Sequence, residues 1–139
     1  MKYMDFIIAE DIRFETGNKF SVMGIYSDLI GLQLPDPDNT QWPIAHRFGV
    51  YIRLGIEASD VIPNRFELKV DHNNNNIAIM NGDIHIKKSV RTISLPLILN
   101  PFPLPGLGRI RFNIELYKNE DLLSSESHEL EISSHQTQN

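Results

Sequence analysis

The chain has 139 residues, which suits one domain, and a domain of this length buries roughly 68% of the surface that its unfolded chain exposes. Hydrophobic residues make up 41% and charged residues 22%, so neither disorder nor a membrane span is indicated, and the absence of cysteine excludes disulfides, thiolate metal sites and a cysteine nucleophile. A formal charge of −5 disfavours general binding to nucleic-acid backbones, which requires clustered lysine and arginine.

The N-terminal apolar run is short. Phe6–Ala9 follows one lysine and one aspartate and is interrupted at once by Glu10, so it does not have the form of a signal-peptide core. We therefore expect a cytoplasmic protein. The segment from Met4 to Ala9 is predicted to form the first strand.

A hairpin is predicted next, between Ile12–Glu15 and Lys19–Val22. A three-residue loop, with Gly17 or Asn18 at positive φ, places residues of the same character opposite one another. The opposed pairs are then Phe14 with Phe20, Ile12 with Val22, and Glu15 with Lys19. A two-residue loop would oppose a charged side chain to an aromatic one, so face matching favours the longer loop.

This stretch resembles a known family. The matching residues are the run IAEDIRFE (Ile8–Glu15), then Gly17, Lys19 and Ser21, and then Val22–Tyr26. They resemble the opening of a family of small bacterial proteins known only as a domain of unknown function. In that family an acidic pair, an arginine and a glutamate precede a turn and a Gly-hydrophobic-Tyr strand. Pro105-Gly106, followed by an alternating strand, a polar turn and a last strand, is similar to that family's C-terminal half. The resemblance implies a small β-sandwich and supplies no activity, cofactor or catalytic residue. Where the family usually has a short Pro-Asp-Gly-like turn, this chain has Asp71–Asn76.

A long connection follows Tyr26. Pro35, Pro37 and Pro43 exclude a helix there, so the segment is expected to cross from one sheet to the other, and it carries Trp42.

Two further strands are predicted by alternation, from Arg47 to Glu57 and from Arg65 to Asp71. Two turn signals then compete. The tetra-asparagine run Asn73–Asn76 is a polar turn, whereas Asn81-Gly82 is the strongest short hairpin dipeptide. The pairing of this region therefore stays open.

The C-terminal half begins with apolar residues at odd positions from Ile93 to Leu99, where Pro96 predicts an edge strand or a bulge. The proline-rich segment Asn100–Gly106 is expected to block regular pairing. Gly108–Tyr117 is the clearest alternating strand of the chain.

After a tight turn at residues 118–121, Leu130 and Ile132 fall on the opposite parity from Leu123. A β-bulge is therefore predicted between Ser124 and His128. The polar tail from Ser133 to Asn139 is expected to fray.

These patterns predict about seven or eight strands and no helix with a 3.6-residue period. The predicted fold is an all-β, antiparallel, two-sheet β-sandwich of immunoglobulin-like or C2-like type. Residues 1–132 form its single domain and residues 133–139 a polar tail.

Charged residues offer two candidate sites. Glu10, Asp11 and Glu15 with Arg13 are suited to a cation or a basic partner, although the outer face of a strand is usually charged for solvation alone. Arg109 and Arg111 share one face of their strand and are suited to an anionic ligand. The alternative is that they are neutralised by glutamates of the neighbouring strand, namely Glu126, Glu129 or Glu131.

Apolar loop residues offer a third candidate. Trp42 lies in the first long loop, and Phe102, Leu104 and Leu107 lie in the proline-rich one. These side chains either close the ends of the sandwich as plugs or form an exposed patch for a partner.

Metal sites are weakly indicated. Calcium would require several aspartates to converge, and only Asp36 and Asp38 are closely spaced; the others available are Asp60, Asp71 and Asp83. None of the five histidines (His46, His72, His85, His128 and His135) forms a close pair, although Asp71, His72, Asp83 and His85 would approach one another if their strands pair. Nucleophile-elbow, phosphate-loop and dinucleotide motifs do not occur in the sequence.

The sequence contains no identifiable active site. The leading interpretation is a non-catalytic binding or adaptor module that recognises another protein or itself, with no cofactor and with neither nucleic acid nor membrane as a partner. The alternative is a metal-dependent hydrolase with its site near Asp71, His72, Asp83 and His85.

Overall fold

The alternating sequence patterns fold into nine strands and one short 3-10 turn. The structure is a computed structural model that describes residues 1–86 and 91–135. Within these residues the elements are, in chain order, β1 (Lys2–Glu15), β2 (Lys19–Tyr26), β3 (Leu29–Gln33), η1 (Pro37–Asn39), β4 (Ile44–Gly55), β5 (Arg65–His72), β6 (Asn75–Asp83), β7 (Thr92–Leu104), β8 (Gly108–Lys118) and β9 (Asp121–His135). The described residues thus form nine strands, whereas about seven or eight were predicted, and β3 lies in a segment that was predicted to be a connection.

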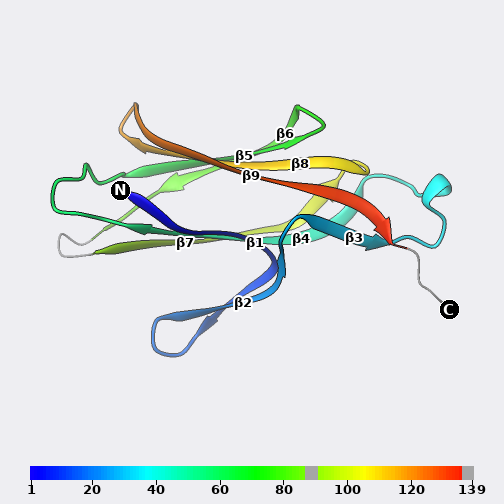
Figure 1. Cartoon of the computed structure of the whole chain (residues 1–139), viewed down its shortest axis with the longest axis horizontal. Helices are drawn as coiled ribbons and strands as arrows, with labels where there is room; N and C mark the ends of the chain where they lie inside the picture. Colours follow the sequence, from blue (N-terminus) through cyan, green and yellow to red (C-terminus); the bar gives the residue numbers. More distant parts are fainter. Residues whose placement is uncertain (87–90, 136–139) are drawn as a thin grey trace.

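The strands form two facing sheets, which confirms the predicted β-sandwich (Figure 1). One sheet has four strands in the order β2-β1-β4-β7, and the other has five in the order β3-β9-β8-β5-β6. All pairings are antiparallel except that of β3 with β9, which is parallel.

The connectivity is that of the immunoglobulin type. Strands β4 and β7 are neighbours, as B and E are in an immunoglobulin domain, and β9-β8-β5-β6 follow the order G-F-C-C′. Each passage from β4 to β5, from β6 to β7 and from β7 to β8 changes sheet, so the two layers are tied together along the chain. The hairpin of β1 and β2 extends the four-stranded sheet beyond this common frame.

The core lies between the two sheets and consists of the apolar residues that the alternation places inward. Phe48 lies at its centre, with its ring edge-to-face against Phe102 and Phe112 at centroid distances of 5.5 and 5.2 Å. The fully buried side chains also come from β4, β5 and β8, and include Ile52, Leu54, Leu68, Ile110, Ile114 and Leu116. Burial of these side chains stabilises the fold at roughly 25 cal/mol for each Å² of apolar surface.

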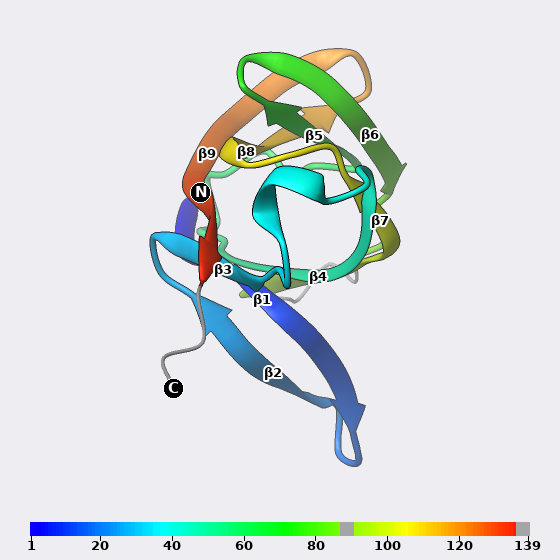
Figure 2. The same cartoon turned by 90° about the vertical axis from the view of Figure 1, so that its right-hand side faces the viewer.

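The hairpin of β1 and β2 leaves the body of the sandwich. Strand β1 pairs with β4 only as far as Ala9, opposite Gly49, and from there to its end it pairs with β2 alone. Gly24, at φ +67°, lies beside the bend. We call residues 10–26 the arm. Figures 1 and 2 show it projecting from the four-stranded sheet on the side away from the five-stranded sheet.

The predicted three-residue hairpin loop is confirmed. Gly17 and Asn18 both have positive φ, at 87° and 56°. The pairs Phe14 with Phe20, Ile12 with Val22, and Glu15 with Lys19 are in register.

The competition between the two turn signals is decided in favour of the asparagine run. Asn73 and Asn74 both adopt left-handed backbone conformations, at φ 47° and 68°, and join β5 to β6. Asparagine tolerates this region better than most residues. Gly82 instead lies inside β6 opposite Phe66, whose ring would be 2.8 Å from a Cβ at that position. A small residue is required there for packing, and no turn forms.

The expectation that the proline-rich segment blocks regular pairing is wrong. The proline-rich segment does pair, since β7 continues to Leu104 with Pro103 opposite Ala45, after a register shift. Strand β7 is the edge of its sheet, as Pro96 predicted, and an edge strand tolerates residues that lack an N–H group.

The bulge in β9 lies earlier than predicted. The register is regular from Ser124 to His128 and shifts between Leu122 and Ser124, so Leu123 is the extra residue. The shift corrects the parity and turns Leu130 inward. Strand β9 then continues through Ser133 and Ser134, the first residues of the expected tail, whereas residues 136–139 lie outside the described part of the chain.

Candidate functional site

The point where β1 separates from β4 forms a hollow that brings two predicted site residues together. We call it the fork. It has a volume of about 490 Å³ and is lined by Glu10, Asp11, Ala45, His46, Arg47 and Asn100. Because β1 no longer pairs with β4 beyond Ala9, these side chains come from three strands, β1, β4 and β7.

An ion pair closes one side of the fork. Arg47 Nη2 lies 2.6 Å from Asp11 Oδ1, and Arg13 Nε lies 3.6 Å from the other carboxylate oxygen. Desolvation alone would raise the pKa of Asp11, but the Arg47 guanidinium, the Ile12 amide and Arg13 outweigh it and hold this pKa below its ordinary value. Asp11 is therefore paired with an arginine of β4 and with Arg13 of its own strand.

A hydrogen-bonded group closes the other side. The Tyr26 hydroxyl lies 3.3 Å from His46 Nε2 and 3.5 Å from Glu10 Oε1. One chain of donation satisfies all three groups, in which His46 N–H donates to Tyr26 and Tyr26 O–H donates to Glu10. Burial and the Glu10 charge raise the pKa of Tyr26 to about 12, and burial lowers the pKa of His46, so both side chains are uncharged at neutral pH.

The fork is suited to hydrogen bonding with a partner and not to nucleophilic catalysis. None of the residues that line it carries an alcohol or thiol that His46 would activate. The Tyr26 phenol holds its proton until strongly alkaline pH. What the fork offers is a polar notch with one glutamate, Glu10, that no ion pair described in the structure engages.

The arm beside the fork exposes large apolar side chains. Phe14 is 65% exposed, Met23 43% and Ile25 57%. Phe14 and Phe20 pack edge-to-face at 5.1 Å, and Phe20 lies 5.9 Å from the ring of Tyr51 on the outer face of the four-stranded sheet. Phe14 and Phe20 are on one face of the hairpin, whereas Met23 is on the other face, opposite Asp11, so both faces of the arm expose apolar side chains.

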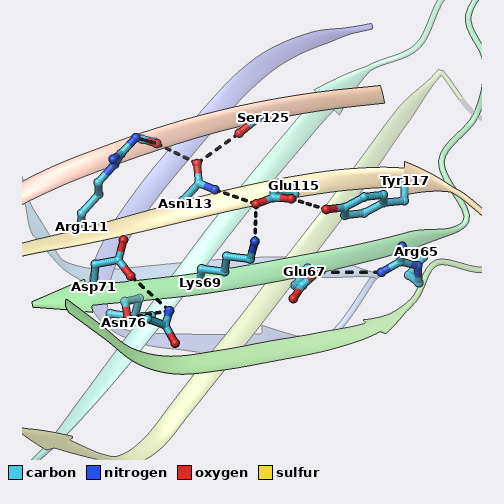
Figure 3. A network of polar contacts seen from close by, with 12 residues as sticks. Arg65, Glu67, Lys69, Asp71, Asn76, Arg111, Asn113, Glu115, Tyr117 and Ser125 are labelled. Atoms are coloured by element: carbon cyan, nitrogen blue, oxygen red, sulfur yellow. Dashed lines mark hydrogen bonds and ion pairs between the residues drawn. The ribbon is translucent and has the colours of Figure 1, made fainter. Parts of the chain in front are cut away.

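The outer face of the five-stranded sheet has the opposite character (Figure 3). Glu115 binds Lys69 Nζ at 2.8 Å and accepts hydrogen bonds from Asn113 and Tyr117, while the Arg65 guanidinium lies 4.0 Å above the Tyr117 ring. The hydrogen bonds from Lys69 and Tyr117 lower the pKa of Glu115. Lys69 and Glu115 therefore satisfy each other's charges at the centre of this face.

Arg109 and Arg111 belong to this face. Arg109 Nε lies 3.2 Å from Glu129, one of the three glutamates expected to neutralise it. Arg111 instead donates to the Ser127 hydroxyl at 2.9 Å. A bound anion would have to compete with these contacts.

Three of the four apolar loop residues follow the plug alternative, whereas Leu107 is 38% exposed. Phe102 and Leu104 are buried in the core as part of β7, and Trp42 packs against the core while partly buried. Glu15 is exposed at the tip of β1, opposite Lys19.

The residues of the predicted hydrolase site are separated. Asp71 lies at one end of the β5–β6 hairpin, and Asp83 lies opposite Arg65 at the other end, six positions or about 20 Å along the strand. His72 binds the Leu107 carbonyl at 2.9 Å. Asp60, a calcium candidate, binds the N-terminal ammonium at 2.7 Å. Among residues 1–86 and 91–135, no three histidine, aspartate or glutamate side chains are placed to share a metal ion.

Sequence reasoning missed four residues of this region, namely Tyr26, His46, Met23 and Ile25. His46 and Tyr26 are 20 positions apart, and only the departure of β1 from β4 brings them together. A signal for Met23 and Ile25 was present, because Val22–Tyr26 is continuously apolar and does not alternate.

Comparisons with known proteins add no relatives, since no family model, no curated protein and no solved structure matches this chain. The resemblance to the small bacterial family therefore stays a prediction. Within the described residues, no helix has the length and apolar character that crossing a membrane requires.

Proposed function

We propose that the protein is a non-catalytic binding module that recognises another protein chain through its arm. The observation that supports this proposal most directly is the exposure of Phe14, Met23 and Ile25 on a hairpin that projects from the body. Scattered apolar residues are ordinary on a protein surface, but a cluster on one projecting element is typical of an interaction site.

The contrast between the two sheets supports the same function. The five-stranded sheet presents a face on which Lys69 is paired with Glu115 and Arg109 with Glu129. The arm presents aromatic and aliphatic side chains whose burial against a partner is favourable. The fork lies at the base of the arm, where Glu10 and the Asp11–Arg47 pair supply a polar rim to this apolar surface.

The metal-dependent hydrolase is the weaker hypothesis. It requires at least three ligands near one point, whereas the register of β5 and β6 holds Asp71 and Asp83 at opposite ends of their hairpin.

Photocrosslinking at matched exposed positions tests the proposal. A benzophenone amino acid replaces Phe14 on the arm or Leu122 at the start of β9, two side chains of comparable exposure. On illumination in cells of the source organism, position 14 is expected to give an adduct heavier by one protein chain, and position 122 is not. Equal labelling at both positions, or no protein adduct at position 14, would contradict the proposed function.

A further inference from the structure

The sequence of β2 is that of a central strand, yet the structure places it at an edge. Val22–Tyr26 is continuously apolar, a pattern that is typical of strands buried on both faces. In the structure β2 pairs only with β1, and Met23 and Ile25 are exposed. A conflict between local sequence and position is expected where a partner completes the structure.

The edge of β2 also has fewer of the devices that protect edge strands than the opposite edge of its sheet. The opposite edge of the same sheet, β7, carries Pro96, Pro101 and Pro103, which hinder pairing with another chain. Strand β2 has no proline, and Lys19 at its first position is its single charged residue. Its unpaired backbone groups therefore form an open template for another strand.

We propose that a second copy of this chain occupies this edge, with β2 of one copy pairing antiparallel to β2 of the other. The two four-stranded sheets then form one continuous eight-stranded sheet across a two-fold axis. This inference rests on the proposed binding function and specifies its partner.

The residues of β2 are compatible with pairing to themselves. With a two-fold axis at Val22, the two Val22 residues lie opposite each other and Phe20 lies opposite Gly24 on one face. On the other face Ser21 lies opposite Met23 and Lys19 lies opposite Ile25, so no like charges are opposed. The two Lys19 side chains then lie roughly 20 Å or more apart, which exceeds the screening length at physiological salt. Lys19 at the end of β2 is the single charge with which the strand can select an oppositely charged partner.

The shape of the molecule permits this pairing. The arm projects from the sandwich, so two arms meet along an eight-residue edge of about 26 Å without bringing the bodies together (Figure 2). Covering the edge and the exposed apolar side chains removes roughly 1,000 Å² in total, which is the lower limit for a specific interface. The dimer is therefore expected to be weak and to dissociate on dilution.

Sedimentation equilibrium tests the assembly. The mass of the wild-type protein is expected to rise from that of a monomer towards twice that value between about 5 and about 500 μM, the range over which so small an interface dissociates. The double variant Met23→Lys/Ile25→Lys is expected to stay monomeric, because it places positive charges near their own symmetry mates. Ile79→Lys, a matched control on the edge strand β6, where Ile79 is 55% exposed, is expected to dimerise like the wild type.

Cysteine crosslinking locates the contact without weakening the fold. The chain contains no cysteine, so Met23→Cys and Ile79→Cys each introduce a single thiol. Under mild oxidation Met23→Cys is expected to form a disulfide-linked dimer at least tenfold faster than Ile79→Cys. A wild-type protein that stays monomeric at about 500 μM, a charged double variant that still dimerises, or equal crosslinking at the two positions would each overturn the second-copy inference. In any of these cases, an adduct between position 14 and a different protein would leave the proposed function standing, whereas the absence of any adduct would remove both.

Discussion

Replacing Gly49 with alanine is expected to strain the contact that fixes the arm to the four-stranded sheet. Ile12 lies over Gly49, and a Cβ at position 49 would be 2.7 Å from Ile12 Cγ1 and 3.3 Å from the backbone carbon of Asp11. Carbon atoms pack best at about 3.5–4.0 Å, so the overlap is about 1 Å. Ile12 is buried and a backbone atom is also close, so neither neighbour moves freely. The expected cost in free energy of unfolding is about 2 kcal/mol, within the range for overpacked sites.

A double-mutant cycle tests whether this contact causes the cost. Ile12→Ala removes the clashing Cγ1 and by itself costs about 2–5 kcal/mol as a large-to-small core change. In that background Gly49→Ala is expected to be neutral or stabilising, because the added methyl group fills the space left by the isoleucine. The expected interaction energy is about 2 kcal/mol, which is typical of residues in direct contact.

Urea unfolding followed by the fluorescence of Trp42, the single tryptophan of the chain, measures all four proteins. Gly17→Ala is the control, because Gly17 has φ +87° and nothing within 4 Å of the added methyl group. It is expected to cost about 1–2 kcal/mol through backbone strain alone, whichever residue occupies position 12. Additivity of Gly49→Ala and Ile12→Ala within about 0.5 kcal/mol would refute the docking of the arm through this contact.

Two further predictions concern the other end of the sandwich and the other sheet. The pKa of Glu115 is lowered from 4.5 in the folded state, so the interactions of this carboxylate stabilise the fold above pH 4.5 and are lost as the pH falls through the folded pKa. The difference in unfolding free energy between wild type and Glu115→Gln, measured by urea unfolding, is therefore expected to be smaller at about pH 3 than at about pH 6, and an equal difference at both would contradict the prediction. Asn73→Ala is expected to lower the free energy of unfolding by about 1–2 kcal/mol, because Asn73 has φ 47° and its Oδ1 accepts a hydrogen bond from the Arg109 N–H at 2.9 Å. Asn74→Gly is expected to leave stability unchanged, and a thermal melt in which both variants match the wild type would exclude this role for Asn73.

The parts of the fold that the sequence predicts are those decided by neighbouring residues. The register of the β1–β2 hairpin follows from matching Phe14 with Phe20 across a three-residue loop, and both partners are visible in one short stretch. The turn at Asn73 and Asn74 was one of two local candidates. The choice between them depended on Phe66, whose ring occupies the space beside Gly82, a contact that no local pattern reveals.

The candidate site was harder to predict because it depends on where a strand leaves its neighbour. Glu10 and Asp11 were singled out from their charge and from a family resemblance, and the structure places both at the fork. His46 joins them only because β1 stops pairing with β4 at Ala9. Alternation cannot predict such a departure, since the residues after it, from Ile12 to Glu15, continue in the same extended conformation.

Strand β2 is the element at which sequence and structure disagree. Strand β2 exposes Met23 and Ile25 beside an edge that carries no proline, and this exposure costs free energy in water. Elsewhere the inward residues of β4, β5 and β8 are buried and Lys69 is paired with Glu115. The exposure of Met23 and Ile25 along the unpaired edge of β2 is best explained if these residues are buried in the working assembly. Crosslinking through position 23 addresses that explanation directly, because it reports contact between copies whether or not the dimer survives dilution.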